Sequence, residues 1–300
     1  MTSQHPGGTV KLGPYEIARI GYGAMQLEKL DRTAAGAVLR RAVELGVNHL
    51  DTASFYGHTT VNQHIRAALH PYADDLVIVS KVGARRVGAP VPLTLAQHPS
   101  QLREQVQLDL TSLGLDQVPV VNLRRADQGP GLIAEGDQLV PLDDQLAELI
   151  ALRNEGLIGA IGLSNVSTQQ LKQALPAGIV CVQNAYSLIN RSSEEQLRLC
   201  ATNGIAWIPY FPLGSAFDRL PYAPFDRIPS PAEHPVVLRI AARLGATPAA
   251  VCLAWILAHA GNTALIPGTR SIAHLEDNLR AAVVELDEDA LAELDAVVSA

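Results

Sequence analysis

Short apolar runs recur along this chain of 300 residues, and most are followed by a segment whose apolar residues have helical spacing. The runs are continuous rather than alternating, which is the pattern of parallel strands covered on both faces. We therefore expect a parallel sheet with helices between its strands. The eight runs that fit are IARIGYG (17–23), VNHLD (47–51), LVIVS (76–80), VPVVNL (118–123), IGAIGL (158–163), IVCV (179–182), IAWI (205–208) and ALIP (264–267).

The segments between these runs carry the start and stop signals of α-helices. Three of them have apolar residues at helical spacing and are followed at once by a glycine, which adopts the left-handed conformation of a helix end without steric cost. Ser167 and Gln170 have the spacing of a capping box, and Thr247 before Pro248 supplies a cap and a first-turn proline. The three segments are 33–45, 143–155 and 193–203.

Eight strand–helix units in one undivided chain favour a closed (β/α)8 TIM barrel over an open doubly wound sheet. No proline- or glycine-rich linker separates a second domain, so we expect residues 1–300 to form a single barrel domain. An open sheet that binds a dinucleotide would carry the fingerprint GxGxxG after its first strand. The nearest stretch, residues 21–26, lacks the third glycine.

Composition excludes several classes of partner. The net charge of −7 and the pI near 5.7 argue against binding to nucleic acid or to an anionic membrane, which calls for a basic surface. No apolar stretch reaches the roughly 20 residues that span a bilayer, and the first ten residues lack the pattern of a secretory signal. Three scattered cysteines and the absence of metal-ligand spacing predict neither disulfides nor a metal site. We expect a cytoplasmic protein.

Polar side chains gather where the predicted strands end, and a barrel keeps its chemistry on that face. Asp51 ends the second strand, Tyr56 follows it, and Lys81 ends the third. An ammonium held by a carboxylate lowers the pKa of a neighbouring phenol, and a shift of ~3 units corresponds to about 4 kcal/mol. We therefore expect Tyr56 to have a lowered pKa and to act as a general acid.

These residues belong to a set of motifs that resembles one family, the aldo-keto reductases, over nearly the whole chain. Members of that family are (β/α)8 barrels that bind NADP(H) across the mouth without a glycine-rich fingerprint, in agreement with its absence here. The matching motifs are Asp51-x-x-x-x-Tyr56-Gly57, Ser80-Lys81, Gly162-x-Ser164-Asn165, Gln183-Asn184, Tyr210-x-Pro212-Leu213-Gly214, and Ile266-Pro267-Gly268-Thr269-Arg270 with Glu276-Asp277-Asn278.

The resemblance implies a role for each matching residue. Tyr56 is the expected general acid, and Asp51 and Lys81 tune it. Arg270 offers a fixed positive fork to a 2′-phosphate, so NADPH is expected to bind in preference to NADH. The expected cofactor residues are Ser164, Asn165 and Gln183 at the carboxamide, Tyr210 beneath the nicotinamide, Leu213, Gly214 and Ser215 along the pyrophosphate, Gly268, Thr269 and Arg270 at the 2′-phosphate, Asp277 and Asn278 at the adenine, together with Ala24, Met25, Asp51, Phe211, Pro212, Ile266 and His274.

One position departs from the family pattern. Most aldo-keto reductases carry a histidine at the end of the fourth strand, where this chain has Arg124. Arginine stays cationic, so Arg124 is expected to bind the carbonyl oxygen or an anionic group of the substrate and to serve as the fourth catalytic residue. The alternative is that Arg124 is a loop arginine without a part in catalysis. Arg125 is expected to be its solvated neighbour.

The wording of several motifs, VNHLDTASFYG and VVNLR among them, resembles a bacterial subgroup of the family associated with pyridoxal reduction. The resemblance implies NADPH-dependent reduction of an aldehyde, with pyridoxal to pyridoxine as the leading reaction. A broad-specificity reductase and an NADPH-binding regulatory subunit with little turnover are the alternatives. We expect a monomer or a weak oligomer whose partner is a small carbonyl compound.

The substrate pocket of such a barrel is built by loops whose shape the sequence does not give. The segment 215–235 is rich in proline and is expected to form an irregular lid, in which Phe217, Tyr222 and Phe225 either wall the pocket or pin the loop to the barrel. Other pocket candidates are Met25, Phe55, His58 and Arg125.

Overall fold

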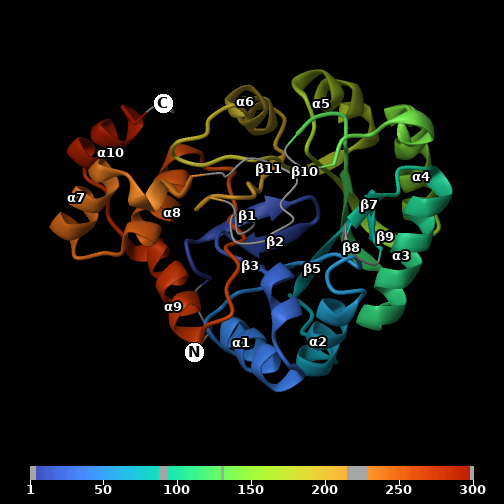
Figure 1. The fold of residues 1–300 in the computed structure, drawn as a ribbon, viewed down its shortest axis with the longest axis horizontal. Coiled ribbons are helices and arrows are strands. Elements are labelled where there is room, and N and C mark those ends of the chain that lie inside the picture. The colour runs from blue at the N-terminus through green and yellow to red at the C-terminus, as the bar shows by residue number, and fades with distance from the viewer. Residues whose placement is uncertain (1–4, 88–92, 130–131, 215–228, 298–300) are drawn as a thin grey trace.

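The computed structural model describes residues 5–87, 93–129, 132–214 and 229–297. Strands occupy the centre of the molecule and helices surround them as an outer ring (Figure 1). The strands are β1 (Thr9–Leu12), β2 (Tyr15–Ala18), β3 (Tyr22–Gly23), β4 (His49–Asp51), β5 (Val77–Val82), β6 (Ala84–Arg86), β7 (Leu93–Leu95), β8 (Val118–Arg124), β9 (Ile158–Ser164), β10 (Ile179–Gln183) and β11 (Ala206–Trp207). The helices are η1 (Ala24–Lys29), α1 (Arg32–Glu44), α2 (Thr60–Leu69), α3 (Pro99–Leu113), η2 (Gly136–Gln138), α4 (Leu142–Asn154), α5 (Thr168–Ala174), η3 (Leu175–Ala177), α6 (Glu194–Thr202), η5 (Pro231–Glu233), α7 (Pro235–Leu244), α8 (Pro248–His259), α9 (Ile272–Arg280), η6 (Ala281–Val283) and α10 (Glu288–Asp295).

The main sheet is parallel and closes into a barrel. Its strands lie in the order β11-β10-β9-β8-β5-β4-β3. The run 263–265 closes the gap between the two end strands through parallel bridges, Trp207 with Thr263 and Ile20 with Leu265. The Leu265 amide donates to the Arg19 carbonyl at 2.8 Å, and the Ala264 amide donates to the Trp207 carbonyl at 2.9 Å. The predicted (β/α)8 barrel is therefore confirmed.

The N-terminal run was assigned incorrectly in one respect. Residues 17–23 were expected to form one barrel strand, but the first part of this run belongs to an antiparallel hairpin, in which β2 pairs with β1. Leu12 and Ile17 of the hairpin pack with Val120 and Ile208 inside the barrel. The hairpin fills one end of the barrel, so its apolar side chains are buried like those of a barrel strand.

Predicted helix signals are present in the structure. Gly46, Gly156 and Gly204 follow α1, α4 and α6 with φ angles of 88°, 80° and 67°, which is the left-handed conformation. The Ser167 hydroxyl and the Gln170 side chain form a capping box at α5, and Thr247 caps α8 before its first-turn proline. Among the described helices, none alone has the length and apolarity to cross a bilayer; α7 and α8 reach both only together, across a 95° bend.

Alternation along the strands positions the site. Ile78, Val121 and Leu163 face the helices and join the larger apolar core. Because neighbouring residues of a strand point to opposite faces, Lys81, Arg124 and Ser164 face the barrel interior, like Val79, Val120 and Ala160 of the inner cluster. The carboxyl ends of β5, β8 and β9 therefore bring three polar side chains to one mouth, as predicted for this fold.

Candidate active site

An ion pair lies at the carboxyl ends of β4 and β5. The Lys81 ammonium donates to the Asp51 carboxylate and, at 3.2 Å, to the carbonyl of Thr52. The two side chains are only 9% and 4% exposed. Burial alone would lower the pKa of Lys81, but the Asp51 carboxylate and the Tyr56 hydroxyl outweigh it and raise that pKa. Lys81 therefore remains an ammonium at physiological pH.

Tyr56 lies on the turn that follows β4, with its ring centroid 5.3 Å from the Lys81 ammonium. Burial raises the pKa of Tyr56, while Lys81 and, more weakly, Arg124 act in the lowering direction. The net direction is upward, so the expectation of a lowered pKa is wrong for the protein without ligands. The cause is that desolvation of the phenol is the larger effect, and the nearby cation offsets only part of it. Tyr56 accordingly holds its proton at physiological pH.

Arg124 is half-buried at the end of β8, in register with Ser164 of β9. Its charge acts to lower the pKa of both Tyr56 and Tyr210, so the guanidinium lies within electrostatic reach of both phenols. The Gln97 amide holds the backbone carbonyl of Arg124 at 2.9 Å. The structure thus brings Arg124 to the same mouth as Tyr56 and Lys81.

Arg125 is buried, at 5% exposure, and is not the solvated neighbour that the sequence suggested. Its guanidinium forms two hydrogen bonds to the Asp127 carboxylate, both 2.7 Å long. It also donates to the Val140 carbonyl at 2.9 Å and to the Gln145 side chain. These partners come from the loop after β8 and from α4, so Arg125 anchors that loop instead of facing the mouth.

The side-chain amides of Gln183 and Asn165 differ in how fully their hydrogen-bonding groups are satisfied. The Gln183 amide donates to the second Asp51 oxygen at 2.7 Å. Its own oxygen is buried and meets no hydrogen-bond donor within the described part of the chain. The Asn165 amide instead donates to the carbonyls of Arg125 and Gln128 at 3.1 and 2.7 Å, and its oxygen accepts from the Tyr210 hydroxyl at 3.1 Å. Of the predicted carboxamide ligands, Gln183 thus has an unsatisfied acceptor, whereas Asn165 is engaged by protein groups.

The segment after β11 makes a tight turn at the mouth. Phe211 has a φ of 59°, in the left-handed region, and packs edge-on against the half-buried Tyr210 ring at 4.9 Å between centroids. The Gly214 amide donates to the Phe211 carbonyl at 3.1 Å, with Pro212 and Leu213 between them. Ser215, the lid aromatics Phe217, Tyr222 and Phe225, and the segment 215–228 lie outside the described residues.

The predicted phosphate end lies where the eighth strand meets α9. Arg270 and His274 are exposed beside the amino end of this helix, and the Ser271 hydroxyl caps the His274 amide at 3.4 Å. Asp277 accepts a hydrogen bond of 2.8 Å from the Thr247 hydroxyl, and Asn278 is buried. The exposed cation at a helix amino terminus is the arrangement that favours an anion.

Two residues that hold this end in place were missed by the sequence reasoning. The buried Tyr22 hydroxyl donates to the Thr269 carbonyl at 2.5 Å, and the Gln26 amide donates to the Gly268 carbonyl at 3.1 Å. A Cβ at Gly268 would lie 2.7 Å from the Gly23 carbonyl oxygen, so the two backbones are too close for a side chain. Ala24 and Met25, on η1 between these contacts, are buried and half-buried. The signal for the missed pair was its place in the GYGAMQ stretch, residues 21–26, which begins at the end of the first predicted strand.

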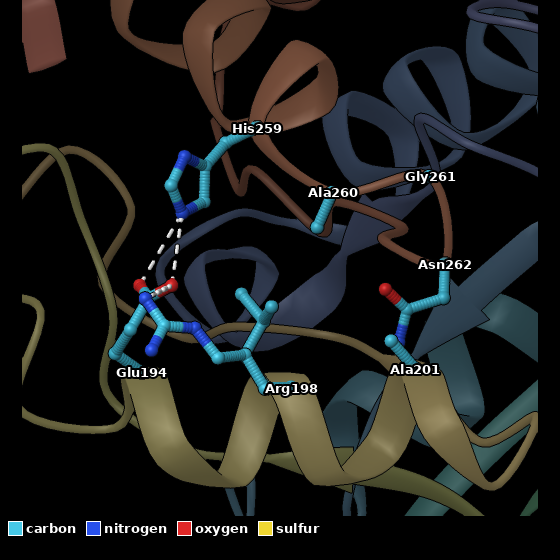
Figure 2. A pocket seen from close by; sticks show the side chains of 8 residues that line it. Glu194, Arg198, Ala201, His259, Ala260, Gly261 and Asn262 are labelled. Carbon is cyan, nitrogen blue, oxygen red and sulfur yellow. Dashed lines mark hydrogen bonds and ion pairs between the residues drawn. The ribbon is translucent and has the colours of Figure 1, made fainter.

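A separate surface hollow lies away from this mouth, along α6 and the loop 260–262 that precedes the eighth strand. Figure 2 shows His259 above Glu194, with its ring nitrogen 3.2 Å from the carboxylate, and Arg198 on the next turn of α6. The loop 260–262 leads into the amino end of the eighth strand, whereas the polar cluster lies at the carboxyl ends of the strands. None of the residues that line the hollow belongs to the polar cluster of Asp51, Tyr56, Lys81 and Arg124 at the mouth.

Comparisons with known proteins agree with this geometry. Residues 19–299 match the model of the Aldo/keto reductase family. The chain is 42% identical to pyridoxine 4-dehydrogenase of Escherichia coli, and the match covers 96% of this chain and 98% of the relative. It is 34% identical to an uncharacterised oxidoreductase of Schizosaccharomyces pombe, and that match covers 96% of this chain and 89% of the relative. An aldo/keto reductase of Klebsiella pneumoniae, solved with NADP and acetate, has a TM-score of 0.77 at 24% identity, covering 96% and 94% of the two chains. The chain belongs to the aldo/keto reductase family.

Proposed function

We propose that this protein reduces an aldehyde to the alcohol with NADPH, and that pyridoxal is its leading substrate. The observation that carries the proposal is the buried Asp51–Lys81 pair beside the Tyr56 phenol at the barrel mouth. The 42% identical relative is named for the oxidation of pyridoxine, which is the reverse of this reaction. The direction in a cell follows the ratio of reduced to oxidised cofactor.

The residues present fit NADPH. The unsatisfied Gln183 oxygen can accept from the carboxamide amine of a nicotinamide, and it lies beside the Asp51–Lys81 pair. Gly23 and Gly268 have no room for a side chain, so the backbone at this end of the mouth is held in close contact. Arg270 is exposed at the amino end of α9, where a 2′-phosphate would gain both a cation and the helix terminus. NADPH, when bound, supplies a hydride to the carbonyl carbon of the substrate.

The chain's own residues supply the proton. Tyr56 keeps its proton because burial raises the pKa of the phenol. As negative charge develops on the substrate oxygen, the phenol donates that proton, and the nearby Lys81 ammonium stabilises the phenolate that remains. One oxygen of the Asp51 carboxylate accepts from the Lys81 ammonium, and the other accepts from the Gln183 amide. These two bonds fix the orientation of the carboxylate. A bulk proton restores the phenol after the alcohol leaves.

Arg124 gives the site a preference among aldehydes. It is the fourth proposed catalytic residue, a cation that stands where most members of the family carry a histidine. Its charge reaches the phenols of both Tyr56 and Tyr210. Pyridoxal carries a phenolate oxygen next to its aldehyde, so one guanidinium can donate to both oxygens.

The test compares NADPH oxidation with pyridoxal, 4-nitrobenzaldehyde and benzaldehyde at matched concentrations. We expect kcat/KM for pyridoxal to exceed that for either benzaldehyde by at least about tenfold, the size of one charge-assisted hydrogen bond. Equal values for the three would leave a broad-specificity reductase. Undetectable hydride transfer in a single turnover, with tight NADPH binding, would instead support a regulatory subunit.

The cysteines bear on the compartment in which the enzyme works. Cys181, Cys200 and Cys252 are free thiols and all three are buried, which suits a reducing compartment such as the cytoplasm. We propose that the protein works there as a monomer or weak oligomer on a small carbonyl compound. Light scattering at micromolar concentration measures the assembly directly, and a stable tetramer would contradict it.

A further inference from the structure

A buried carboxyl group lies behind the proposed reaction centre, on the outer face of the barrel wall, where α3 covers β5. Asp109 of α3 is completely buried. One of its oxygens accepts from the Ser80 hydroxyl at 2.6 Å, and the other accepts from the Asn62 amide at 2.8 Å. The backbone amide of Ser54 also donates to the carboxyl group. Asp109 thus joins α3 to α2, to β5 and to the turn that follows β4.

Each of the donors is linked through the chain or through hydrogen bonds to a residue proposed to act in catalysis. Ser80 precedes Lys81 on β5, and the two side chains point to opposite faces of the strand. The oxygen of Asn62 accepts from the Thr52 hydroxyl at 2.7 Å. Thr52 follows Asp51 directly, and its carbonyl accepts from the Lys81 ammonium.

The third donor controls the turn that carries the general acid. Ser54 is buried and lies between Asp51 and Tyr56 in the chain. The Tyr56 amide donates to the Ala53 carbonyl at 3.0 Å, so the turn is compact and a shift at Ser54 reaches the phenol. Asp109 therefore holds both the strand that carries the ammonium and the turn that carries the phenol.

The chemistry of these partners calls for a carboxyl group. Three donors converge on two oxygens, and an asparagine at this position would turn an amide nitrogen towards one of them. Burial raises the pKa of Asp109 to about 7, and the bonds from Ser80 and Asn62 lower it only in part. A group that is costly to ionise is thus kept in a place where the proposed mechanism makes no direct use of it.

We propose that Asp109 is a positioning residue for carbonyl reduction, which sets the separation of the Tyr56 hydroxyl and the Lys81 ammonium by tying the 52–54 segment to β5. It touches neither substrate nor cofactor and acts through Ser80, Asn62 and Ser54. The inference rests on the proposed function, because the separation matters only if the phenol is the proton donor.

The first measurement uses Asp109→Asn in the full-length protein. We expect kcat for aldehyde reduction to fall about 10- to 100-fold, because displacement of a catalytic group by roughly 1 Å costs that much. The Kd for NADPH, read from nucleotide fluorescence, should stay within about twofold. The hydrogen bonds of Asp109 lie on the outer face of the barrel, away from the proposed cofactor residues. Ser112→Ala is the matched control: it removes a neighbouring hydroxyl on α3 that accepts from Asn62 at 3.0 Å and donates to the Asp109 backbone carbonyl at 3.3 Å, but it leaves every bond to the Asp109 carboxyl group. Its kcat should remain that of the wild type.

The second measurement exchanges the two partners in the variant Asn62→Asp/Asp109→Asn. The exchange restores the bond between positions 62 and 109, because the new amide at 109 donates to the new carboxylate at 62, which still accepts from Thr52, and the amide oxygen at 109 still accepts from Ser80. Only the bond from position 62 to Ser112 is lost, and Ser112→Ala controls for that loss. We expect its kcat to return to within about threefold of the wild type. Recovery of this kind is not expected from a group that contributes stability alone.

The outcomes separate the two proposals. A wild type without aldehyde reduction refutes the proposed function and is seen before any variant is made. A wild type that reduces aldehydes, together with unchanged kcat in Asp109→Asn, overturns the role of Asp109 alone. An exchange variant that binds NADPH normally and yet is as slow as Asp109→Asn overturns it too. Should Asp109→Asn not fold, the exchange variant and Ser80→Ala, with an expected loss of about tenfold in kcat, decide the matter by the same two readouts.

Discussion

The two halves of the barrel mouth are built differently. The proton-transfer half, defined by Asp51, Tyr56 and Lys81, has its charged groups bonded to one another across neighbouring strands. The cofactor half, defined by Ser164, Asn165, 210–214 and 268–270, shows exposed or internally bonded groups instead. Arg270 faces solvent, whereas the Asn165 amide holds the carbonyl groups of a loop.

The difference indicates where each half obtains its organisation. The proton-transfer half is organised before any ligand arrives, and such preorganisation avoids reorientation during the reaction. In the proposed complex with NADPH, Asn165 exchanges some of its internal hydrogen bonds for bonds to the nucleotide. Substitutions in the first half should therefore change rate constants, and substitutions in the second should change binding constants.

The largest expected effect is that of Tyr56→Phe. Removal of the phenolic hydroxyl takes away the proposed proton donor, and general acids contribute roughly 10²- to 10⁴-fold in rate. We expect kcat to fall about 10³-fold while the Kd for NADPH is unchanged, measured by stopped-flow hydride transfer and fluorescence titration. A variant with wild-type turnover would remove the basis for separating the two halves.

A smaller effect, on the pH dependence of stability, is expected from His49, which lies beneath the proton-transfer half. His49 lies two residues before Asp51, fully buried, and neither of its ring nitrogens has a hydrogen-bond partner among the described residues. Burial lowers its pKa to about 4, and the Lys81 charge adds to this although Asp51 opposes it. The native state therefore favours neutral imidazole, a preference that is fully present above the ordinary pKa near 6.5 and lost as pH falls through 4.

We expect His49→Leu to remove this acid sensitivity. Between pH 6.5 and 4 the free energy of unfolding of the wild type should decrease by about 3 kcal/mol more than that of the variant. Urea denaturation at several pH values measures the difference, and groups common to both proteins cancel. Parallel pH profiles would show that the imidazole is protonated as readily in the folded chain as in the unfolded one.

Much of the fold was predictable because burial leaves a direct trace in sequence. Strands covered on both faces are continuously apolar, so the order of strands and helices followed from the runs alone. The same apolar pattern gave a wrong prediction at residues 17–23, which were expected to form one barrel strand. Ile17 is buried because its hairpin fills one end of the barrel, not because it belongs to the barrel wall. Burial of a side chain does not reveal which partner buries it.

The site was predictable where strand ends fix position and unpredictable where distant partners do. Asp51 and Lys81 meet because their strands are neighbours. Arg124 and Arg125 are adjacent and of one residue type, and only the loop after β8 and α4 decide that Arg125 is buried. Asp109 had left a signal, since it shares the apolar face of α3 with Leu102, Val106 and Leu113. A lone carboxyl on such a face indicates a buried partner.

In the cofactor half, Arg270→Ala should change discrimination between cofactors. Loss of a charge-assisted hydrogen bond of about 1.5–3 kcal/mol predicts a 10- to 100-fold decrease in the NADPH/NADH ratio of kcat/KM. Arg280→Ala, an exposed arginine at the far end of α9, is the matched control and should keep the wild-type ratio. An unchanged ratio in Arg270→Ala would place the 2′-phosphate elsewhere.

The smallest effect is expected for Tyr22→Phe, which tests whether the cofactor half depends on its support from β3. The Tyr22 hydroxyl is the donor that holds the Thr269 carbonyl, and a net hydrogen bond of this kind contributes about 0.5–1.5 kcal/mol. The Kd for NADPH should rise about 3- to 10-fold as the 268–270 loop loosens, while kcat at saturating NADPH stays constant because Asp51, Tyr56 and Lys81 are held by other contacts. If kcat fell and the Kd did not, the two halves would be mechanically coupled through β3, and the division between rate and binding would have to be abandoned.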